Sequence, residues 1–474
     1  MTTGIAITGL DGAEVTLSAE DVDGLAQRAQ GPLLQAGDEG WDDAVLIWNG
    51  MVAKVPALVL RPTSAAGVAA AVQFAADHGV LLGVKGGGHN IAGTSMAPGG
   101  LTLDMSLMRG VTVDPEARLV HVDAGCLIKH VDAATQEHGL ATVLGFVSET
   151  GVAGLTLGGG IGYLSRRWGW TVDCLEEVQV VTADGQVRTA SRDEHADLFW
   201  ALRGGGGNFG VATRFTFRLH EVGPNITGGL VAWSAERADE VLDVYQSLTE
   251  SAPRELTAVC TVRLAPPAPF IPPEWHGRPM VGMVLCHTGP NAETDLAPVK
   301  ALGDPIADLV MEKTYLAQQS MLDATQPKGL HYYWKTEYVP GLEDGYLATF
   351  KEAALKVSSP LSQSICFHLG GALNELPEDD GAVGNRDAAF VTGFAGCWAP
   401  PDERAEEHKA WVRSSWETIR PFSTGGNYVN FQVADDDDDR TASAYRANYE
   451  QLEKVKAAYD PYNLLRVNRN IAPS

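Results

Sequence analysis

Three glycine-rich segments constrain the fold of this chain more than any other feature of its sequence. They are KGGGHNIAG (85–93), ETGVAGLTLGGGIG (149–162) and RGGGGNFGVA (203–212). Consecutive glycines cost backbone entropy to order, and they suit places that need positive φ or close approach of another group. Main-chain N–H groups in such loops can point at an anion without a Cβ in the way. One such loop is typical of a tight turn, but three loops predict one long, anionic, ring-bearing ligand.

The common glycine-rich nucleotide motifs do not explain these segments. The third segment contains G-x-G-x-x-G at Gly205, Gly207 and Gly210. A predicted helix precedes this motif and a predicted strand follows it, which is the reverse of the order in a dinucleotide-binding fingerprint. None of the three segments has the G-x-x-x-x-G-K-[ST] pattern of a P-loop. The sequence therefore predicts a ligand cradled by backbone, outside the Rossmann and P-loop folds.

The pattern of helices and strands changes along the chain. From about 55 to 220, strands alternate with helices such as TSAAGVAAAVQFAADHG (63–79), which opens with a Ser/Thr cap and ends on glycine. Beyond about 222, longer amphipathic helices alternate with strands, which indicates a mixed sheet with helices on one face. The last segment returns to a helix and a tight turn. We expect three parts, with these bounds: 1–222, 223–420 and 421–474.

Charge and cysteine usage exclude several classes of partner. The net charge of −25 argues against nucleic acid and anionic membranes, because both attract basic patches. The six cysteines contain no C-x-x-C pair, which predicts buried free thiols and no metal site. The start of the chain lacks the pattern of a signal peptide, and no apolar run could span a membrane. We expect a cytoplasmic protein that binds a small molecule.

Two later motifs complete a pattern that is typical of a known family. YVNF (428–431) and YDPYN (459–463) follow the glycine segments. Together these blocks resemble the berberine bridge enzyme-like FAD-linked oxidases of the vanillyl-alcohol oxidase/p-cresol methylhydroxylase flavoprotein superfamily, from about residue 55 to the C-terminus. The resemblance implies an α+β fold. In it, 1–222 and 421–474 form a two-part FAD-binding domain, and 223–420 is an inserted substrate domain of antiparallel sheet covered by helices.

The resemblance also implies a set of cofactor-binding residues. His89 is expected to be bonded covalently to the 8-methyl carbon of the flavin, and a neutral imidazole is a competent nucleophile for that position. The remaining residues expected to contact FAD come from the glycine segments, YVNF and the C-terminal tail: Lys85, Gly86, Gly87, Gly88, Asn90, Gly93, Thr150, Gly151, Gly154, Gly158, Gly159, Gly160, Gly162, Gly210, Val211, Asn430 and Asn468.

The sequence departs from the family at Lys85, which is one of these residues, and at Val147. Many relatives carry a second flavin link through a cysteine, and Val147 stands at the matching position here. We therefore expect one covalent link, through His89. Lys85 stands where relatives often have arginine, and it can neutralise a phosphate only as a point charge.

The resemblance implies a base beside the flavin that accepts the proton of the substrate. Relatives often use the first residue of the YVNF-type motif, which is Tyr428 here. A phenol has a pKa near 10 and needs a positive field to lower it, which the flavin or Lys335 would supply. The alternative is a packing tyrosine whose hydroxyl only binds the flavin. Other candidates for the base come from the substrate domain: Tyr332, Tyr333, Glu337 and His368.

By resemblance we expect an oxidase that converts an alcohol of a small natural product or xenobiotic to a carbonyl. Hydride would pass to flavin N5 and O2 would be reduced to H2O2, in a monomer or homodimer. The alternatives are a dehydrogenase with another acceptor, an oxidase of amines or carbohydrates, and a non-catalytic flavin-binding protein. A 2-hydroxy-acid enzyme would need an anchoring arginine. Arg263 and Arg386 lie in the expected substrate domain, but outside any recognisable anchoring motif.

Thr150 bears on the choice between oxidase and dehydrogenase. In relatives, a small valine at this position goes with oxidase behaviour and a bulkier residue with dehydrogenase behaviour. Threonine has nearly the shape of valine, so we expect it to leave space for O2.

Overall fold

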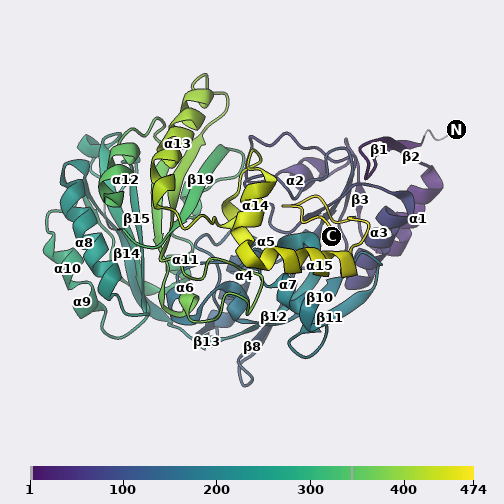
Figure 1. Ribbon diagram of the computed structural model, residues 1–474, viewed down its shortest axis with the longest axis horizontal. Coiled ribbons are helices and arrows are strands. Elements are labelled where there is room, and N and C mark those ends of the chain that lie inside the picture. The colour runs from purple at the N-terminus through teal and green to yellow at the C-terminus, as the bar shows by residue number, and fades with distance from the viewer. Residues whose placement is uncertain (1–3, 343–344) are drawn as a thin grey trace.

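Two sheets form the first half of the protein, whose computed structural model describes residues 4–342 and 345–474 (Figure 1). Their strands are β3 (Leu33–Leu34), β4 (Leu58–Leu60), β5 (Leu82–Lys85), β6 (Leu101–Asp104), β7 (Val111–Asp114), β8 (Leu119–Asp123), β10 (Leu175–Val181), β11 (Val187–Ser191) and β12 (Val211–Arg218). One sheet has the order β3-β4-β6-β5, with β4, β6 and β5 parallel. The other, β11-β10-β12-β8-β7, is antiparallel.

Helix α3 (Ala65–His78) packs in the core of this half, and its ends confirm the sequence prediction. The side chain of Ser64 accepts a hydrogen bond from the N–H of Gly67, so it caps the helix. Gly79 ends the helix in the left-handed conformation, at φ 62°. A residue with a Cβ would be strained there.

An eight-stranded sheet dominates the second half. Its strands are β14 (Asn225–Ser234), β15 (Leu256–Leu264), β16 (Pro279–His287), β17 (Ala307–Asp308), β18 (Met311–Thr314), β19 (His331–Val339), β20 (Gln363–His368) and β21 (Phe390–Trp398). Their order is β17-β14-β16-β15-β20-β21-β19, and β18 also pairs with β14. Figure 1 shows helices α8 (Ala238–Ser251), α12 (Tyr346–Ala354) and α13 (Ala405–Ile419) on the outer face. The other face turns toward the first half of the protein and forms part of a cavity.

The sheet is antiparallel, which confirms the fold implied by the resemblance and corrects the mixed sheet expected from the helix pattern. Strands β14 and β15 are joined by α8 and run in the same direction. However, β16 lies between them and pairs antiparallel with both, so these neighbouring strands are antiparallel.

The C-terminal segment packs against the first half of the protein. Helices α14 (Asp438–Tyr445) and α15 (Tyr449–Tyr459) follow the sheet, and α15 contacts α7 (Ala196–Leu202) (Figure 1). Leu452 of α15 lies in the same buried cluster as Leu198 of α7. This packing is compatible with a two-part domain of 1–222 and 421–474, although the domain boundaries themselves stay a prediction.

A buried ion pair ties the C-terminal segment to the third glycine segment. The Nζ of Lys456 donates to Oδ2 of Asp460 at 2.6 Å and to the carbonyl of Asn208 at 2.9 Å. Asn208 in turn accepts from the N–H of Ile471. Because both charged side chains are fully buried, this contact is costly to break.

The remaining elements are short or lie at the edges. They are β1 (Ile5–Thr8), β2 (Glu14–Leu17), α1 (Ala19–Ala29), α2 (Trp41–Val45), α4 (Ile128–Gln136), β9 (Leu140–Ala141), α5 (Val152–Leu157), α6 (Ser165–Trp168), β13 (His220–Glu221), α9 (Ala292–Asp295), α10 (Ala297–Ala301) and α11 (Tyr315–Gln319). All six cysteines are buried and free, as predicted. Within residues 4–342 and 345–474, no helix is both long and apolar enough to cross a membrane.

Candidate active site

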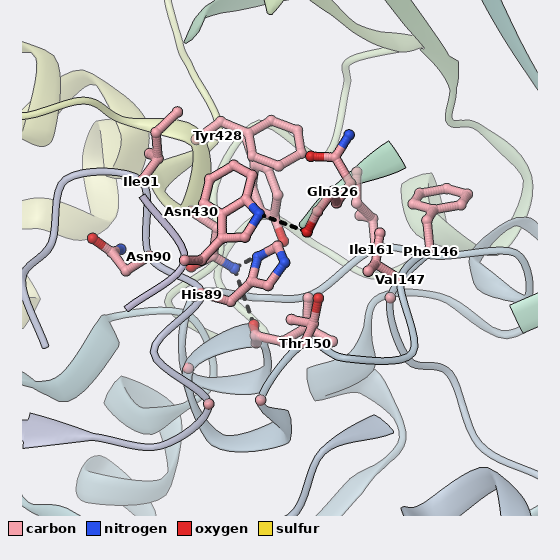
Figure 2. A pocket seen from close by; sticks show the side chains of 18 of the residues that line it. His89, Asn90, Ile91, Phe146, Val147, Thr150, Ile161, Gln326, Tyr428 and Asn430 are labelled. Atoms are coloured by element: carbon pink, nitrogen blue, oxygen red, sulfur yellow. Dashed lines mark hydrogen bonds between the residues drawn. The ribbon is translucent and has the colours of Figure 1, made fainter. Parts of the chain in front are cut away.

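One large cavity lies between the glycine loops and the inner face of the eight-stranded sheet. Its volume is ≈ 460 Å³, within the range of small-molecule sites. All three glycine-rich segments contribute to its wall, and so do the YVNF motif and the tail after α15. The predicted residues that line it are Gly86, Gly87, Gly88, His89, Asn90, Thr150, Gly151, Gly154, Gly158, Gly210, Val211, Tyr428, Asn430 and Asn468. Figure 2 shows His89, Thr150, Tyr428 and Asn430 grouped in one part of this wall.

His89 presents a neutral imidazole to this cavity. Its ring stacks on Trp48, with centroids 4.5 Å apart, and Trp48 stacks in turn on Tyr332 at 3.7 Å. Burial is the main cause that lowers the pKa of His89 to about 4. Its Nε2 is buried and has no hydrogen-bond partner in the described part of the chain. The imidazole is therefore held by stacking and uncharged at neutral pH.

The glycines of the first two loops allow their backbones to touch. A Cβ on Gly87 would lie 2.5 Å from the nitrogen of Gly151, and a Cβ on Gly151 would lie 2.3 Å from the nitrogen of Gly87. Gly154 and Gly207 differ, because a Cβ there would meet no atom within 4 Å. Both of these glycines line the cavity. They leave space that a ligand can fill against bare backbone.

Two hydrogen-bond donors contact the hydroxyl oxygen of Tyr428. Its hydroxyl oxygen accepts from the N–H of Gly160 at 3.2 Å and from Nδ2 of Asn430 at 2.9 Å. The same Nδ2 also donates to the carbonyl of Leu155 at 3.1 Å. These donors favour the phenolate form, but burial is the larger effect and raises the pKa of Tyr428 above its usual value.

Five residues predicted to contact the cofactor lie outside the cavity wall. The Nζ of Lys85 donates to the carbonyl of Ala44 at 2.7 Å, so this cation contacts the C-terminal end of α2. The other four are glycines that pack against the protein itself. A Cβ added to any of them would contact a neighbouring residue: Val52 for Gly93, Val383 and Trp170 for Gly159, Thr171 for Gly160, and Leu144 for Gly162. These glycines are needed for close packing, and Gly160 acts on the site through its N–H to Tyr428.

Strand alternation turns Tyr333 away from the cavity. Trp334 of β19 lines the cavity, and its neighbours along the strand point to the opposite face. There the hydroxyl of Tyr333 donates to Asp435 at 2.7 Å and accepts from Arg413 at 2.9 Å. Tyr333 is therefore a contact beneath α13, which corrects its assignment as a catalytic candidate.

The same face holds Lys335 and Glu337. Lys335 pairs with Asp436 at 2.5 Å, and Glu337 pairs with Arg440 at 2.7 Å. The positive charge of Lys335 is thus paired with a carboxylate, and Lys335 does not lower the pKa of Tyr428.

His368 is turned away in the same manner. Gln363, Ile365 and Phe367 of β20 line the cavity, so His368 points to the other face. Its Nε2 lies 2.8 Å from Nη1 of Arg166, and burial followed by that cation lowers the pKa of His368 to about 2. This assignment as a catalytic candidate is also corrected. Tyr332 uses its hydroxyl to donate to the carbonyl of Pro327 at 2.6 Å.

Sequence reasoning missed several residues of the cavity wall. Trp48 lies outside every recognised motif, and no signal in the sequence marks it. Asn208 follows four glycines much as Asn90 follows Gly-Gly-Gly-His, so the third segment did offer a signal for it. Arg263 lines the cavity, whereas Arg386 lies outside its wall and donates to both carboxylate oxygens of Asp173, at 2.6 and 3.0 Å.

Two family models match parts of this chain. Residues 56–191 match the model of the family described as "FAD binding domain", and residues 427–472 match "Berberine and berberine like". The chain is 28% identical to (R)-6-hydroxynicotine oxidase of Paenarthrobacter nicotinovorans, over 94% of this chain and 97% of that protein.

Two solved structures share the fold at comparable identity. The 6-hydroxy-D-nicotine oxidase from Arthrobacter nicotinovorans matches with a TM-score of 0.82 and 26% identity, over 94% of this chain and 98% of that one. The glucooligosaccharide oxidase from Acremonium strictum matches with a TM-score of 0.83 and 25% identity, over 96% and 99%. The latter carries a 6-S-cysteinyl, 8α-N1-histidyl FAD.

Proposed function

Because this chain belongs to the berberine bridge enzyme-like FAD-linked oxidoreductases, we propose that it oxidises a hydroxyl group of a small natural product or xenobiotic to a carbonyl. One observation carries the proposal. The Tyr428 hydroxyl, held by two N–H donors, lines the same cavity as the neutral imidazole of His89. The site thus combines an attachment point for a flavin with a group that can take up a proton.

The residues of the cavity fit FAD. The neutral imidazole of His89 in the cavity wall supports a covalent bond to the flavin, and the open space beside Gly154 and Gly207 suits its phosphates. When bound, FAD supplies the acceptor for the hydride of the substrate and passes the electrons to dioxygen.

A single covalent link is proposed. Val147 lines the cavity wall, and neither Cys126 nor Cys174 does. The thiol of Cys126 contacts the carbonyl of Gly110 and that of Cys174 contacts His220, so both point away from the proposed flavin site.

Tyr428 is the proposed proton acceptor for the substrate hydroxyl. Once ionised, its oxygen is stabilised by Gly160 and Asn430, and a hydrogen bond to a charged group is worth about 1.5–3 kcal/mol. Because burial raises the pKa of Tyr428, the ionised form becomes common only at alkaline pH. The rate of oxidation should therefore rise with pH. At low pH the phenol is already protonated, so it cannot accept the proton of the substrate hydroxyl.

The sheet side of the cavity favours an apolar substrate. Val259, Ile365 and Phe367 line it from neighbouring strands, and Phe146 lies 4.9 Å from Phe367, measured between ring centroids. A wall of this kind buries aromatic or aliphatic surface, which suits an aromatic alcohol better than an oligosaccharide.

Stopped-flow mixing of the holoenzyme with substrates under anaerobic conditions tests the proposal. We expect aromatic alcohols to bleach the flavin absorbance, while the matching amines and cellobiose leave it unchanged. Admitting air should then restore the absorbance and release one H2O2 per carbonyl formed. Bleaching by amines or sugars alone would favour the alternative substrates, and reoxidation by quinones but not by air would make the enzyme a dehydrogenase.

A further inference from the structure

Arg263 is a partly buried cation that makes few hydrogen bonds to the protein. It lies near the end of β15 and lines the cavity. Its Nη1 donates to Oε1 of Gln363 at 3.3 Å, and its Nε is buried without a partner among the described residues. Burial lowers the pKa of Arg263, and no carboxylate in the described part of the chain offsets this effect. A guanidinium has five N–H donors, so most of them remain available.

The cavity is cationic although the chain is acidic. The chain has 60 Asp and Glu residues against 35 Lys and Arg, yet within the described residues the cavity wall contains two arginines and no carboxylate. The second arginine, Arg469, donates to the carbonyls of Asp436 and Val433. Arg469 thus uses two of its donors on the protein, whereas Arg263 uses one, so Arg263 keeps the larger unused capacity.

Strand register places Arg263 away from Tyr428. Val259 pairs with Phe367 and Arg263 pairs with Gln363 on the same two strands, and all four side chains line the cavity. Phe367 lies 6.0 Å from Phe431 of the YVNF motif, so this pair marks the Tyr428 end. Four residues along a strand span about 13 Å, which is the separation expected between the two ends.

From these contacts we infer that Arg263, with Gln363 beside it, binds an acidic group of the substrate at the end of the cavity remote from Tyr428. The inference rests on the proposed function and narrows its substrate to elongated, largely apolar alcohols that carry a carboxylate. A carboxylate can accept two parallel N–H groups of a guanidinium, which offsets the cost of burying that charge. A 2-hydroxy acid does not fit, because its carboxylate is attached directly to the carbon that is oxidised.

Isothermal titration calorimetry with a matched pair of probes tests the inference. The probes are biphenyl-4-carboxylate and its methyl ester, which lack an oxidisable hydroxyl group, titrated into the purified holoenzyme. We expect the acid to bind at least about tenfold more tightly than the ester, as one charge-assisted hydrogen bond predicts. In Arg263→Gln this preference should fall to about twofold or less while ester binding stays unchanged, and Arg263→Lys should restore part of it.

Arg254→Gln is the matched control, because Arg254 pairs with Glu375 at the surface and its loss changes the net charge equally. It should keep the full preference for the acid, and all variants should keep the flavin absorbance of a folded holoenzyme. Equal or absent binding of the acid to the wild type, or an undiminished preference in Arg263→Gln, would overturn the inference. Because these probes cannot be oxidised, their binding is measured apart from turnover, and a failure to oxidise 4'-(hydroxymethyl)biphenyl-4-carboxylate would contradict only the proposed function.

Discussion

His89 shows how one residue can be prepared for covalent chemistry by its surroundings. Trp48 holds the imidazole by stacking, and burial keeps it neutral over the physiological range of pH. A protonated imidazole has no lone pair to form a bond, so burial here favours reactivity. The two effects come from different parts of the chain, since Trp48 precedes the glycine segments.

We predict that His89→Ala abolishes covalent flavin, because the neutral ring nitrogen is the proposed point of attachment. After acid precipitation, the wild-type pellet should stay yellow and mass spectrometry should find FAD on the peptide that contains His89. The control is His138→Ala, at an exposed position, which should keep the flavin attached. Free FAD in the supernatant of the wild type, with an unmodified His89 peptide, would contradict the prediction.

Tyr428→Phe should slow flavin reduction by about 10²–10⁴-fold, the usual loss when a general base is removed. Substrate binding should weaken by only about 0.5–1.5 kcal/mol, the value of one hydrogen bond. The wild-type reduction rate should rise with pH through the alkaline range, since burial raises the pKa of Tyr428, and the variant should lose this rise. Stopped-flow reduction measured across pH tests all three expectations. Tyr333→Phe is the control and should reduce at the wild-type rate, and the same rate in Tyr428→Phe would show that another residue takes the proton.

Thr150→Leu should slow the reaction of the reduced enzyme with O2 while leaving substrate binding in place. Thr150 lines the cavity beside His89 (Figure 2), and leucine would fill the space that its smaller, valine-like shape leaves open. Mixing reduced enzyme with air-saturated buffer measures the rate directly. Thr150→Val keeps the shape and should reoxidise within seconds, as the wild type should. Equal rates in the leucine variant would rule out steric control at this position.

At the scale of the elements, strand alternation decides which predicted residues reach the site. The sequence indicates strands around HYYWK and ICFH, and the structure has β19 and β20 there. Period-two alternation groups Tyr333 with Lys335, but it does not say which group faces the cavity. That choice depends on α13, whose buried residues pack against β19 and β21.

The glycine segments were more informative than the strands because each glycine answers a local requirement. Positive φ, close backbone contact and open space beside the chain all favour glycine, so each of them places a glycine in the sequence. For this reason, eleven predicted residues of the glycine segments line the cavity, while Gly93 and Gly162 serve packing instead. Trp48 and Arg263 are brought to the cavity by the tertiary fold alone, so no local pattern could have assigned them.

At the scale of the whole molecule, a buried ion pair joins the C-terminal segment to the first half of the protein. Lys456 donates to Asp460, and Asp460 also accepts from the N–H groups of Leu464 and Leu465. These contacts fix the tail that carries Asn468 and Arg469 to the cavity wall.

We predict that Lys456→Met destabilises the protein by about 3–5 kcal/mol, because it leaves the carboxylate of Asp460 buried without its partner. Urea unfolding of the two proteins measures the difference. The exposed pair of Lys454 with Glu450 provides the comparison, and Lys454→Met should cost no more than about 0.5 kcal/mol. A similar, small loss for both variants would mean that the buried pair contributes little.

The shared wall of the cavity also sets an order of events during synthesis. A ribosome releases the glycine loops of residues 85–212 long before the tail of residues 465–469, yet both line the same cavity. The first half of the chain can begin to fold while the rest is still being made. Its binding wall is finished only when the tail has emerged and docked. A ligand that needs every side of this cavity must therefore meet a chain that has already been translated as far as that tail.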